Sequence, residues 1–532
     1  MNEDIAMLVG KWLLALLPII VLLFTILYLK WDAPKSGAVA WFTSMLIGSV
    51  IFGADNRLLA LANSKGMSLS AYVLLIVWSA VYLYNIVEKV GAVKVIGDNM
   101  ISITKDKALQ VLIMAWCFSS FMQGIAGFGV PIAVVAPIMV VMGFQPVVAV
   151  ATCLVGYCWS ISFGSMGSSF YTIQLVTSIP AVTIGTWMSI IFIVPVFLSG
   201  FGTLFIFGGK SAVKHGMPAV LVTGTVICSS MWLMNILDAG QLATMIPALL
   251  GCCTLAIMAR TRIYRENSQE ESFVIAAAET NTCSTVKKMG FHLAFSPYYI
   301  LIALSLLAQI KGAAHLFSPL SWGLDYPAEQ TVFGYMVKPE HMYARINLLN
   351  HPGPLMMIAA LGGILVFKRA GYWRSEILGE AAAKTIKQCI TTSVGIITMV
   401  MMAISMNDAG ITSLLANGMA GATGKLFPVL SPYIGVLGAF LTGSNTNANV
   451  MFGALQAETA KVLGISSVII AAVQSVGAAV GCSIAPTTVM LGSTTVGMNG
   501  RESEVMSRTI PYCLGISLMV GIYAWIFSYI IF

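Results

Sequence analysis

Nearly apolar stretches recur along this chain of 532 residues, for example at 12–29, 67–86 and 511–532. About 20 such residues form a helix long enough to cross the hydrocarbon core of a bilayer. Only 9% of the residues are charged, whereas a soluble globular protein carries about a quarter. We therefore predict an all-α polytopic membrane protein.

Basic residues gather in loops on one predicted side of the membrane. Two predicted spans separate Lys210 from the basic loop that begins at Arg260, and two more lead to the basic residues after Lys368. An even number of crossings returns the chain to the same side, which is cytoplasmic by the positive-inside rule. The predicted organisation is an N-terminal transmembrane half at 1–259, a cytoplasmic linker at 260–294 and a C-terminal transmembrane half at 295–532, with an external loop at 311–352.

The composition argues against an enzyme. The net charge of +7 is explained by these loops and does not indicate a nucleic-acid partner. Most of the ten cysteines lie in apolar runs, where cysteine behaves as a small hydrophobe. The chain holds no H-E-x-x-H, no G-x-S-x-G and no phosphate-binding glycine loop. We predict neither catalytic residues nor a cofactor.

Two segments of the chain resemble each other at a nearly constant separation. Residues 121–124 (FMQG) align with 440–443 (FLTG) at an offset of 319, and 143–156 align with 464–477 at an offset of 321. In each half an apolar run meets a glycine-rich polar patch, and a short apolar stretch and a full span follow. The sequence therefore predicts two related halves, each with an interrupted or re-entrant segment.

The first interruption, FMQGIAGFGVP at 121–131, places three glycines, a proline and Gln123 inside an apolar run. Irregular backbone at membrane depth is tolerated where it lines a polar cavity or is buried in protein. A helix that restarts after the break offers free N–H groups and a positive dipole end to an anion. Paired breaks of this kind are typical of secondary transporters, whose site lies between them near the membrane midplane.

The second interruption, TGSNTNANVMFG at 442–453, is richer in polar residues. Five of six consecutive positions carry hydrogen-bonding side chains: Ser444, Asn445, Thr446, Asn447 and Asn449. One interpretation is an N-cap and turn before a helix that begins near Val450. The other is a binding site, because a capped helix start still binds a carboxylate, and amide and hydroxyl oxygens are ligands that hard cations prefer. The two interpretations are compatible.

The chain resembles the L-lactate permease family of secondary transporters. The stretches that carry the resemblance are SITKDKALQVL (102–112), FMQGIAGFGVP (121–131), SFGSMG (162–167), NDAGITSLLA (407–416) and LGAFLTGSNTNANVMFGALQAETA (437–460). The resemblance implies about 12–14 transmembrane helices. It also implies a plasma-membrane location and proton-coupled uptake of lactate, glycolate and related 2-hydroxy monocarboxylates.

The chain departs from that family's pattern where charged residues are expected. Members usually carry an acid where this chain has Gln123 and Asn445, and a lysine where it has Cys482; the stretches 157–164 and 485–488 also differ. A carboxylate inside the membrane is a natural proton carrier, whereas an amide does not titrate. The resemblance therefore secures the fold and leaves the energy source open.

Three candidates remain for the coupling role. Asp408 lies in an apolar run, where a helix-terminal carboxylate facing water is the alternative. Glu458 follows the second break, where an ion pair with Lys461 on one helical face is the alternative. The third is Na+, bound by amides, hydroxyls and unwound carbonyls. The coupling-ion candidates are Asn445, Asn447, Asn449 and Asp408, and a Na+ site is predicted at Ser444, Asn445 and Thr446.

The predicted substrate site joins the two breaks. Their helix starts are expected to hold a carboxylate, and nearby hydroxyls to meet the substrate's own hydroxyl. The residues assigned to this site are Gln123, Gly124, Gly127, Gly129, Tyr157, Ser162, Ser165, Ser168, Ser444, Asn445, Thr446, Thr487 and Thr488.

The predicted function is symport of L-lactate or a related small 2-hydroxy monocarboxylate across the plasma membrane, coupled to H+ or Na+. An uncoupled facilitator or channel for small organic anions is one alternative, and a Na+-coupled carboxylate transporter with a different substrate is another. The expected partners are the monocarboxylate and the lipid bilayer, with no nucleic acid. A homo-oligomer is compatible with the sequence.

Overall fold

The computed structural model describes residues 2–127, 129–265, 289–308, 321–347 and 350–531. Most of the predicted cytoplasmic linker (266–288), the first part of the predicted external loop (311–320) and Phe128 lie outside these residues. The described residues contain 11 helices long and apolar enough to cross a membrane, or up to 12 if a bent pair is one span. The all-α polytopic membrane fold is thereby confirmed, although only the upper count reaches the expected range of about 12–14 spans.

The two halves of the chain contain the same succession of elements. The first half comprises α1 (Asn2–Leu27), α2 (Ala33–Phe52), α3 (Asn56–Lys89), α4 (Ala92–Ile101), the continuous span α5 (Lys107–Val111), η1 (Leu112–Phe118) and α6 (Ser119–Ile125), then α7 (Val130–Val141), α8 (Pro146–Gly156), η2 (Tyr157–Ser160) and α9 (Gly164–Thr177). The second half comprises α15 (Ser296–Ala308), α17 (Pro352–Ala370), α18 (Glu376–Asp408), α19 (Ile411–Thr423), η4 (Gly424–Leu426), α20 (Phe427–Thr442), α21 (Asn445–Val462), α22 (Ser467–Gly481), η5 (Cys482–Ile484) and α23 (Pro486–Thr495). The repeat predicted from two short alignments therefore extends over most of the chain.

Left-handed glycines mark equivalent turns in the two halves. Gly91 precedes α4 with φ 85°, and Gly410 precedes α19 with φ 82°, 319 residues later. Gly143 and Gly464, which are 321 residues apart, have φ 91° and 69° at the turns after α7 and α21. Residues with a Cβ rarely adopt this conformation. The turns therefore repeat at the spacing at which the sequence segments align.

Other helices connect or complete the two halves: α10 (Ala181–Ile191), α11 (Ile193–Ile236), η3 (Gly240–Leu242), α12 (Met245–Met258), α13 (Arg262–Arg265), α14 (Phe291–Ala294), α24 (Glu502–Ile526) and η6 (Phe527–Ile531). The run formed by α10 and α11 spans 56 residues. A straight helix of that length would extend roughly 84 Å, more than twice the thickness of a hydrocarbon core. Non-helical backbone at Gly208 and Gly209 divides the run into two helical parts. Each part is long enough to cross the membrane once.

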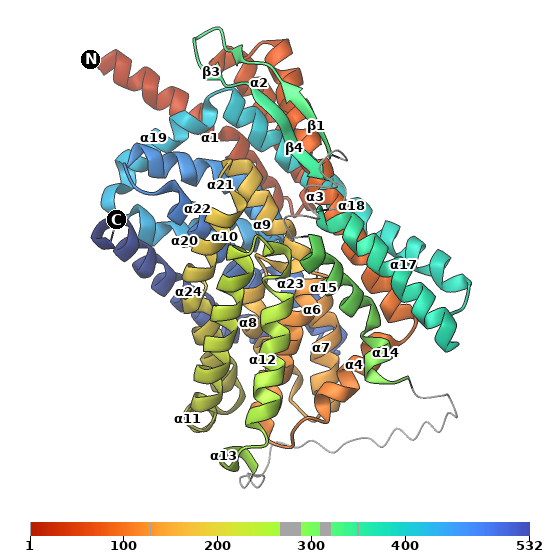
Figure 1. Ribbon diagram of the computed structural model, residues 1–532. Helices are drawn as coiled ribbons and strands as arrows, with labels where there is room; N and C mark the ends of the chain where they lie inside the picture. Colours follow the sequence, from red (N-terminus) through yellow and green to blue (C-terminus); the bar gives the residue numbers. More distant parts are fainter. Residues whose placement is uncertain (1, 128, 266–288, 309–320, 348–349, 532) are drawn as a thin grey trace.

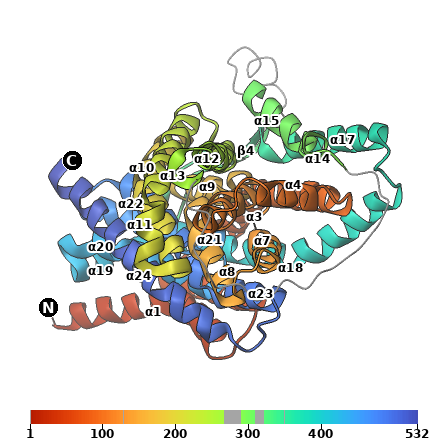
Figure 2. The same cartoon turned by 90° about the horizontal axis from the view of Figure 1, so that it is seen from below.

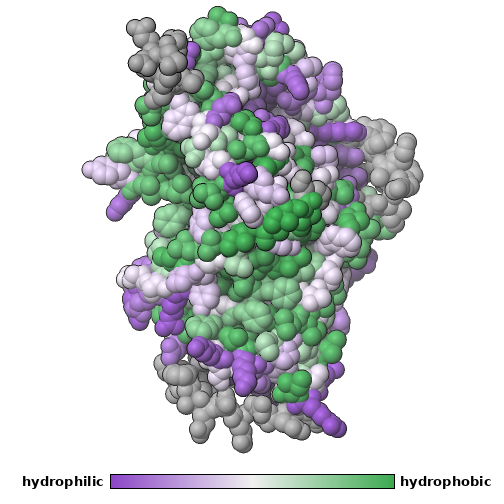
Figure 3. All heavy atoms as spheres, turned by 90° about the vertical axis from the view of Figure 1, so that its left-hand side faces the viewer, coloured by the Kyte–Doolittle hydropathy of each residue, from purple (hydrophilic) through white to green (hydrophobic). Residues whose placement is uncertain are grey.

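The helices form two groups (Figures 1 and 2). In the first, the long helices α3 and α18 pack against each other, with α2 on α18 and α17 on α3. In the second, α20 and α21 pack on α22, and α9 packs on α21. Figure 3 shows a continuous apolar area across the middle of one face, with hydrophilic side chains below it, as a bilayer requires.

The described part of the predicted external loop contains two short antiparallel sheets. Strands β1 (Ser321–Tyr326) and β4 (Glu340–Asn347) pair antiparallel, and β2 (Glu329–Gln330) pairs with β3 (Met336–Val337). The hairpin rests on the turn between α2 and α3, where the amide of Val332 donates to the carbonyl of Gly53 at 2.8 Å. An ion pair between Arg57 and Glu329 at 2.9 Å adds to this contact.

Two glycine substitutions test the docking of this hairpin. A Cβ at Gly410 would lie 3.0 Å from the ring of Tyr335, whereas a Cβ at Gly91 would meet nothing within 4 Å. Both positions have left-handed backbone, so alanine at either should cost about 1–2 kcal/mol. We expect Gly410→Ala to lower the thermal unfolding temperature of the purified protein further than Gly91→Ala does. Equal shifts would show that Tyr335 does not rest on this turn.

Candidate functional site

Both predicted interruptions are breaks in helical backbone. The first helix stops at Ile125, Ala126 is extended, and α7 starts after Gly129, whose φ is 81°. The second stops at Thr442, passes through left-handed Gly443 and extended Ser444, and restarts at once. The expected helix start near Val450 was therefore wrong. Ser444 is the N-cap, with its hydroxyl accepting from the amide of Asn447 at 3.3 Å, so the asparagines belong to the first turns of α21.

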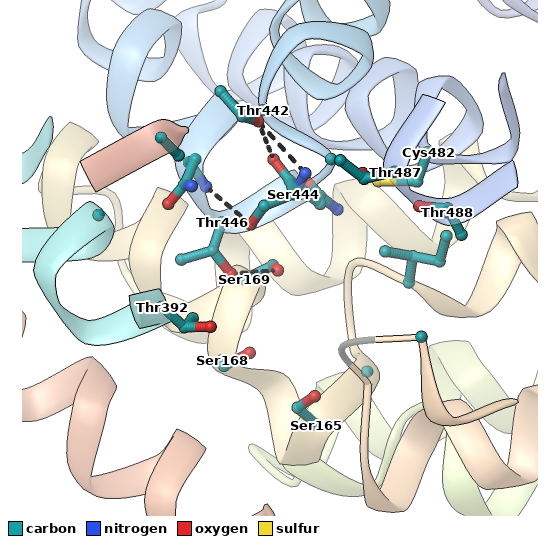
Figure 4. Close-up of a pocket in the computed structure, with 18 of the residues that line it drawn as sticks. Ser165, Ser168, Ser169, Thr392, Thr442, Ser444, Thr446, Cys482, Thr487 and Thr488 are labelled. Carbon is teal, nitrogen blue, oxygen red and sulfur yellow. Dashed lines mark hydrogen bonds between the residues drawn. The ribbon is translucent and has the colours of Figure 1, made fainter. Parts of the chain in front are cut away.

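A cavity of about 370 Å³ lies where the two breaks meet. This volume falls within the range of roughly 300–1,000 Å³ that small-molecule sites occupy. Most residues assigned to the substrate site line it: Gln123, Gly129, Tyr157, Ser165, Ser168, Ser444, Asn445, Thr446, Thr487 and Thr488. Of the coupling-ion candidates, Asn445 and Asn447 line it as well. Figure 4 shows the hydroxyls of several of these residues around one open space.

Three assigned residues lie outside the lining and support it instead. Gly124 faces α12, where a Cβ would lie 3.1 Å from the backbone of Met245. The amide of Gly127 donates to the hydroxyl of Ser165 at 2.7 Å, which ties the first break to α9. Ser162 lies behind Asn445 and accepts a hydrogen bond from its amide nitrogen at 2.9 Å.

The sequence did not predict one wall of the cavity. Asp32, Ala33 and Pro34 at the start of α2 contribute to this wall, and so do Thr391, Thr392 and Gly395 of α18. Both segments are far in sequence from the breaks. Asp32 fits its place as the N-cap of α2, because aspartate is a good N-cap and proline fits the first turn, but such a helix start gives no sign of a cavity.

Five helix starts face the cavity. They belong to α2, α7, α9, α21 and α23, each of which contributes lining residues from its first turn or its N-cap. Free N–H groups and the dipole make a helix start attractive to anions. The sequence predicted this role for two of them, and the fold brings the other three to the same space.

The charge of the cavity wall is low. Among the described residues no lysine, arginine or histidine lines the cavity, and Asp32 is the one lining residue with a charged side chain. Asp32 is exposed and caps its own helix, accepting from the amide of Lys35 at 3.3 Å. Backbone dipoles and hydroxyls are therefore the groups of the described wall that could attract an anion.

A hydrogen-bonded network joins the two halves behind the wall. The hydroxyls of Ser162 and Ser475 lie 3.0 Å apart, and the amide nitrogen of Asn449 donates to Ser475 and to the carbonyl of Ser169 at 3.0 and 3.1 Å. The hydroxyls of Ser169 and Thr446 lie 2.8 Å apart (Figure 4). These bonds hold α9, α21 and α22 in a single arrangement.

Strained backbone accompanies this network in α9. Ser165, Met166 and Gly167 have φ of 48°, 53° and 81° within a segment that is otherwise helical. Left-handed residues other than glycine cost about 1–3 kcal/mol and cluster at functional sites. The strain turns Ser165 toward Gly127 at the first break, so the two breaks and α9 form one structural unit.

Asp408 is not at the cavity and does not face water. It is the last residue of α18, and its carboxylate lies 3.2 Å from the ammonium of Lys65 in α3. The exposed fractions of the two side chains are 8% and 3%. Lys65 also reaches Glu340 of the hairpin at 3.3 Å. Burial raises the pKa of Glu340, and the positive charge of Lys65 lowers it by a smaller amount. The water-facing alternative for Asp408 was therefore wrong, and the sequence missed its partner Lys65.

Glu458 forms the ion pair that the alternative interpretation predicted. Its carboxylate pairs with Lys461 at 2.6 Å on the surface of α21. Exposed pairs of this kind contribute little to stability. Glu458 is not among the residues that line the cavity.

Comparison with known proteins now places the chain. A family model described as L-lactate permease matches residues 11–531. The chain belongs to the L-lactate permease family. An L-lactate permease of Salmonella typhi is 29% identical over 86% of this chain and 84% of its own length. One of Bacillus subtilis is 27% identical over 96% and 94%, and the glycolate permease GlcA of Escherichia coli is 27% identical over 97% and 96%.

Membership in the L-lactate permease family confirms several of the predictions. The protein is a transporter of the cell membrane with multiple spans, and it is not an enzyme. In this member of the family, the two amides predicted to replace acids lie on the cavity wall, at Gln123 and Asn445. The identity of the coupling ion stays a prediction.

The buried ion pair gives a test of stability. Asp408→Asn leaves Lys65 with Glu340 of the hairpin as its remaining carboxylate among the described residues. Losing one member of a buried pair costs roughly 3 kcal/mol or more, a loss that Glu340 reduces here. We expect a clearly lower thermal unfolding temperature for this variant, with recovery in the double variant Lys65→Met/Asp408→Asn. Glu458→Gln, which breaks the exposed pair with Lys461, serves as the matched control and should change little. An equally small effect of Asp408→Asn would contradict the assignment of this pair as a structural clamp.

Proposed function

We propose that this protein is a secondary active symporter that carries L-lactate or a related small 2-hydroxy monocarboxylate across the cell membrane together with a cation. The observation that carries the proposal is the convergence of five helix starts and a ring of hydroxyls on a cavity between two broken helices. The relatives named L-lactate permease and glycolate permease support this class of substrate.

The carboxylate of the substrate is assigned to the helix starts. Each start carries about half a positive charge. The starts of α21 and α23 lie in the cavity wall with Ser444, Asn445, Thr487 and Thr488, and nothing cationic among the described lining residues competes with them. An anion held in this way is bound without a salt bridge, so it is released without breaking one.

The 2-hydroxyl group is assigned to free hydroxyls of the wall. The side-chain oxygens of Ser168, Thr487 and Thr488 line the cavity and make no hydrogen bond to other described residues. A substrate hydroxyl both donates and accepts, so it pairs with such groups. This arrangement favours a 2-hydroxy acid over an acid of similar size that lacks the hydroxyl.

Uptake into proteoliposomes tests the proposal directly. With the full chain reconstituted, labelled L-lactate should accumulate above its external concentration when an inward gradient of Na+ or of H+ is imposed. Unlabelled glycolate should compete, and propionate should compete less well. Protein-free liposomes are the control. Equilibration without accumulation under both gradients would identify an uncoupled facilitator, and uptake that no 2-hydroxy acid inhibits would contradict the substrate class.

Removal of a wall hydroxyl should affect affinity selectively. Thr488→Val keeps the shape of the side chain and removes one hydrogen-bonding group, whose net contribution is about 1 kcal/mol. We expect the KM for L-lactate to rise about fivefold. The corresponding change for propionate should be smaller. Thr186→Val is the matched control, since Thr186 is half-buried, does not line the cavity and bonds to its own helix at Val182. Equal effects on both substrates would remove Thr488 from hydroxyl recognition.

A further inference from the structure

Three buried amide oxygens in α21 have no hydrogen-bond partner among the described residues. They are the Oδ1 atoms of Asn445, Asn447 and Asn449, whose exposed fractions are 2%, 6% and 0%. Buried polar atoms are almost always paired, because leaving one unpaired is costly. Other unpaired buried atoms of the described residues are scattered along the chain, whereas these three occupy alternate positions of a single helix that begins at the cavity. That clustering points to a partner that is not part of the protein.

The hydrogen bonds of Asn449 fix which end of its amide is the nitrogen. One amide atom lies 3.1 Å from the carbonyl oxygen of Ser169, which only accepts, so that atom donates and is Nδ2. Nδ2 also donates to the hydroxyl of Ser475 at 3.0 Å. Oδ1 of Asn449 is therefore an acceptor that the protein leaves free.

The same reasoning applies to Asn445. The hydroxyl of Ser162 lies 3.0 Å from the carbonyl of Ser475, to which it donates its proton. The contact of 2.9 Å between Ser162 and Asn445 then has Nδ2 of Asn445 as its donor. Oδ1 of Asn445 is left free at the wall of the cavity.

Asn445 and Asn449 share one face of α21. Residues four apart on a helix lie one above the other, whereas Asn447, two positions away, lies on another face. The nitrogens of Asn445 and Asn449 are both anchored to serines of one network. Their two free acceptor oxygens therefore belong to the same face of the helix. The hydroxyls of Thr446 and Ser169, which lie 2.8 Å apart (Figure 4), are part of the same network, because the carbonyl of Ser169 accepts from Asn449.

The free amide oxygens accept hydrogen bonds or bind cations, and this chemistry narrows the choice of ligand. A carboxylate is repelled by acceptor oxygens, and the hydroxyl of a 2-hydroxy acid has one proton, which satisfies one of them. Amides do not titrate, so a proton is not held there. A hard cation accepts several oxygen ligands at once. Since the group contains no carboxylate, its charge suits a monovalent ion better than a divalent one.

We infer that the side-chain oxygens of Asn445 and Asn449 are ligands of a sodium ion bound against the side of α21 at its first two turns, while the end of that helix is left to the anion. The inference rests on the proposed symport, because the ion would compensate the charge of the substrate in a cavity whose described wall has no cationic side chain. It deepens the predicted site at Ser444, Asn445 and Thr446 by adding Asn449 and by naming the free ligand atoms. Transporters of this kind bind Na+ at broken helices through unwound backbone carbonyls and helix C-terminal ends. In this protein the amide oxygens would supply equivalent neutral oxygen ligands.

Binding of the ion is measured first, without transport. Thermal unfolding of the detergent-purified full chain is followed in NaCl, KCl and choline chloride at equal ionic strength. A ligand that binds the folded state raises the unfolding temperature with its concentration. We expect Na+ to stabilise the protein selectively, and Asn445→Ala and Asn449→Ala to need at least tenfold more Na+ for the same shift. Asn417→Ala, at an exposed asparagine of α19, is the matched control.

Transport in proteoliposomes then links the ion to uptake. At equal pH on both sides, an inward Na+ gradient should drive accumulation of L-lactate, and the half-maximal Na+ concentration should rise at least tenfold in Asn445→Ala. Equal effects of Na+, K+ and choline on wild-type unfolding would overturn the sodium site, even if the variants fail to fold. Accumulation driven by a pH gradient alone would overturn it too and leave the proposed symport standing. Selective Na+ binding without uptake of any 2-hydroxy acid would instead overturn the proposed substrate and keep the site.

Discussion

The requirement that backbone polar groups be paired inside a membrane governs this structure. Two helices stop at Ile125 and Thr442, where the chain leaves helical geometry for several residues. Free N–H and C=O groups at such ends are tolerated in a membrane because they lie in protein or face a polar space. Each break therefore needs protein or a polar space around it, and in this structure the two breaks share one cavity.

The chemistry of the cavity follows from what surrounds it. Helix starts supply partial positive charge, which suits a carboxylate, while the amide oxygens of Asn445 and Asn449 supply partial negative charge, which suits a cation. Neither set alone neutralises its ligand. An anion and a cation bound together would satisfy both sets at once. This gives a physical reason for the proposed coupling, because Asp32 is the one charged side chain among the described residues of the wall.

The local features could be predicted from the sequence, and the tertiary ones could not. Glycines and polar residues inside an apolar run indicate a break in a helix, so the sequence located both breaks. Most of the residues assigned at these breaks line the cavity. The start of α21 was misplaced because Ser444 and the asparagines after it are all good capping residues. The wall from Asp32 and Thr392 and the partner of Asp408 depend on packing between distant helices, which no local pattern records. The hairpin at 321–347 did carry a signal, since Trp322, Leu324 and Tyr326 alternate along β1.

The distribution of lining residues between the two helix groups bears on how the site could open. The breaks, α9 and α23 contribute the assigned ligands, whereas α2 and α18 of the other group contribute one wall. The network through Ser162, Ser475 and Asn449 lies wholly within α8–α9, α21 and α22. The buried pair of Lys65 and Asp408 lies wholly within α3 and α18, which it holds together. A displacement of one group relative to the other would act against the packing of α3 on α9 and of α18 on α21. It would leave the assigned ligands of the breaks, α9 and α23 together and would break neither of these buried polar clusters.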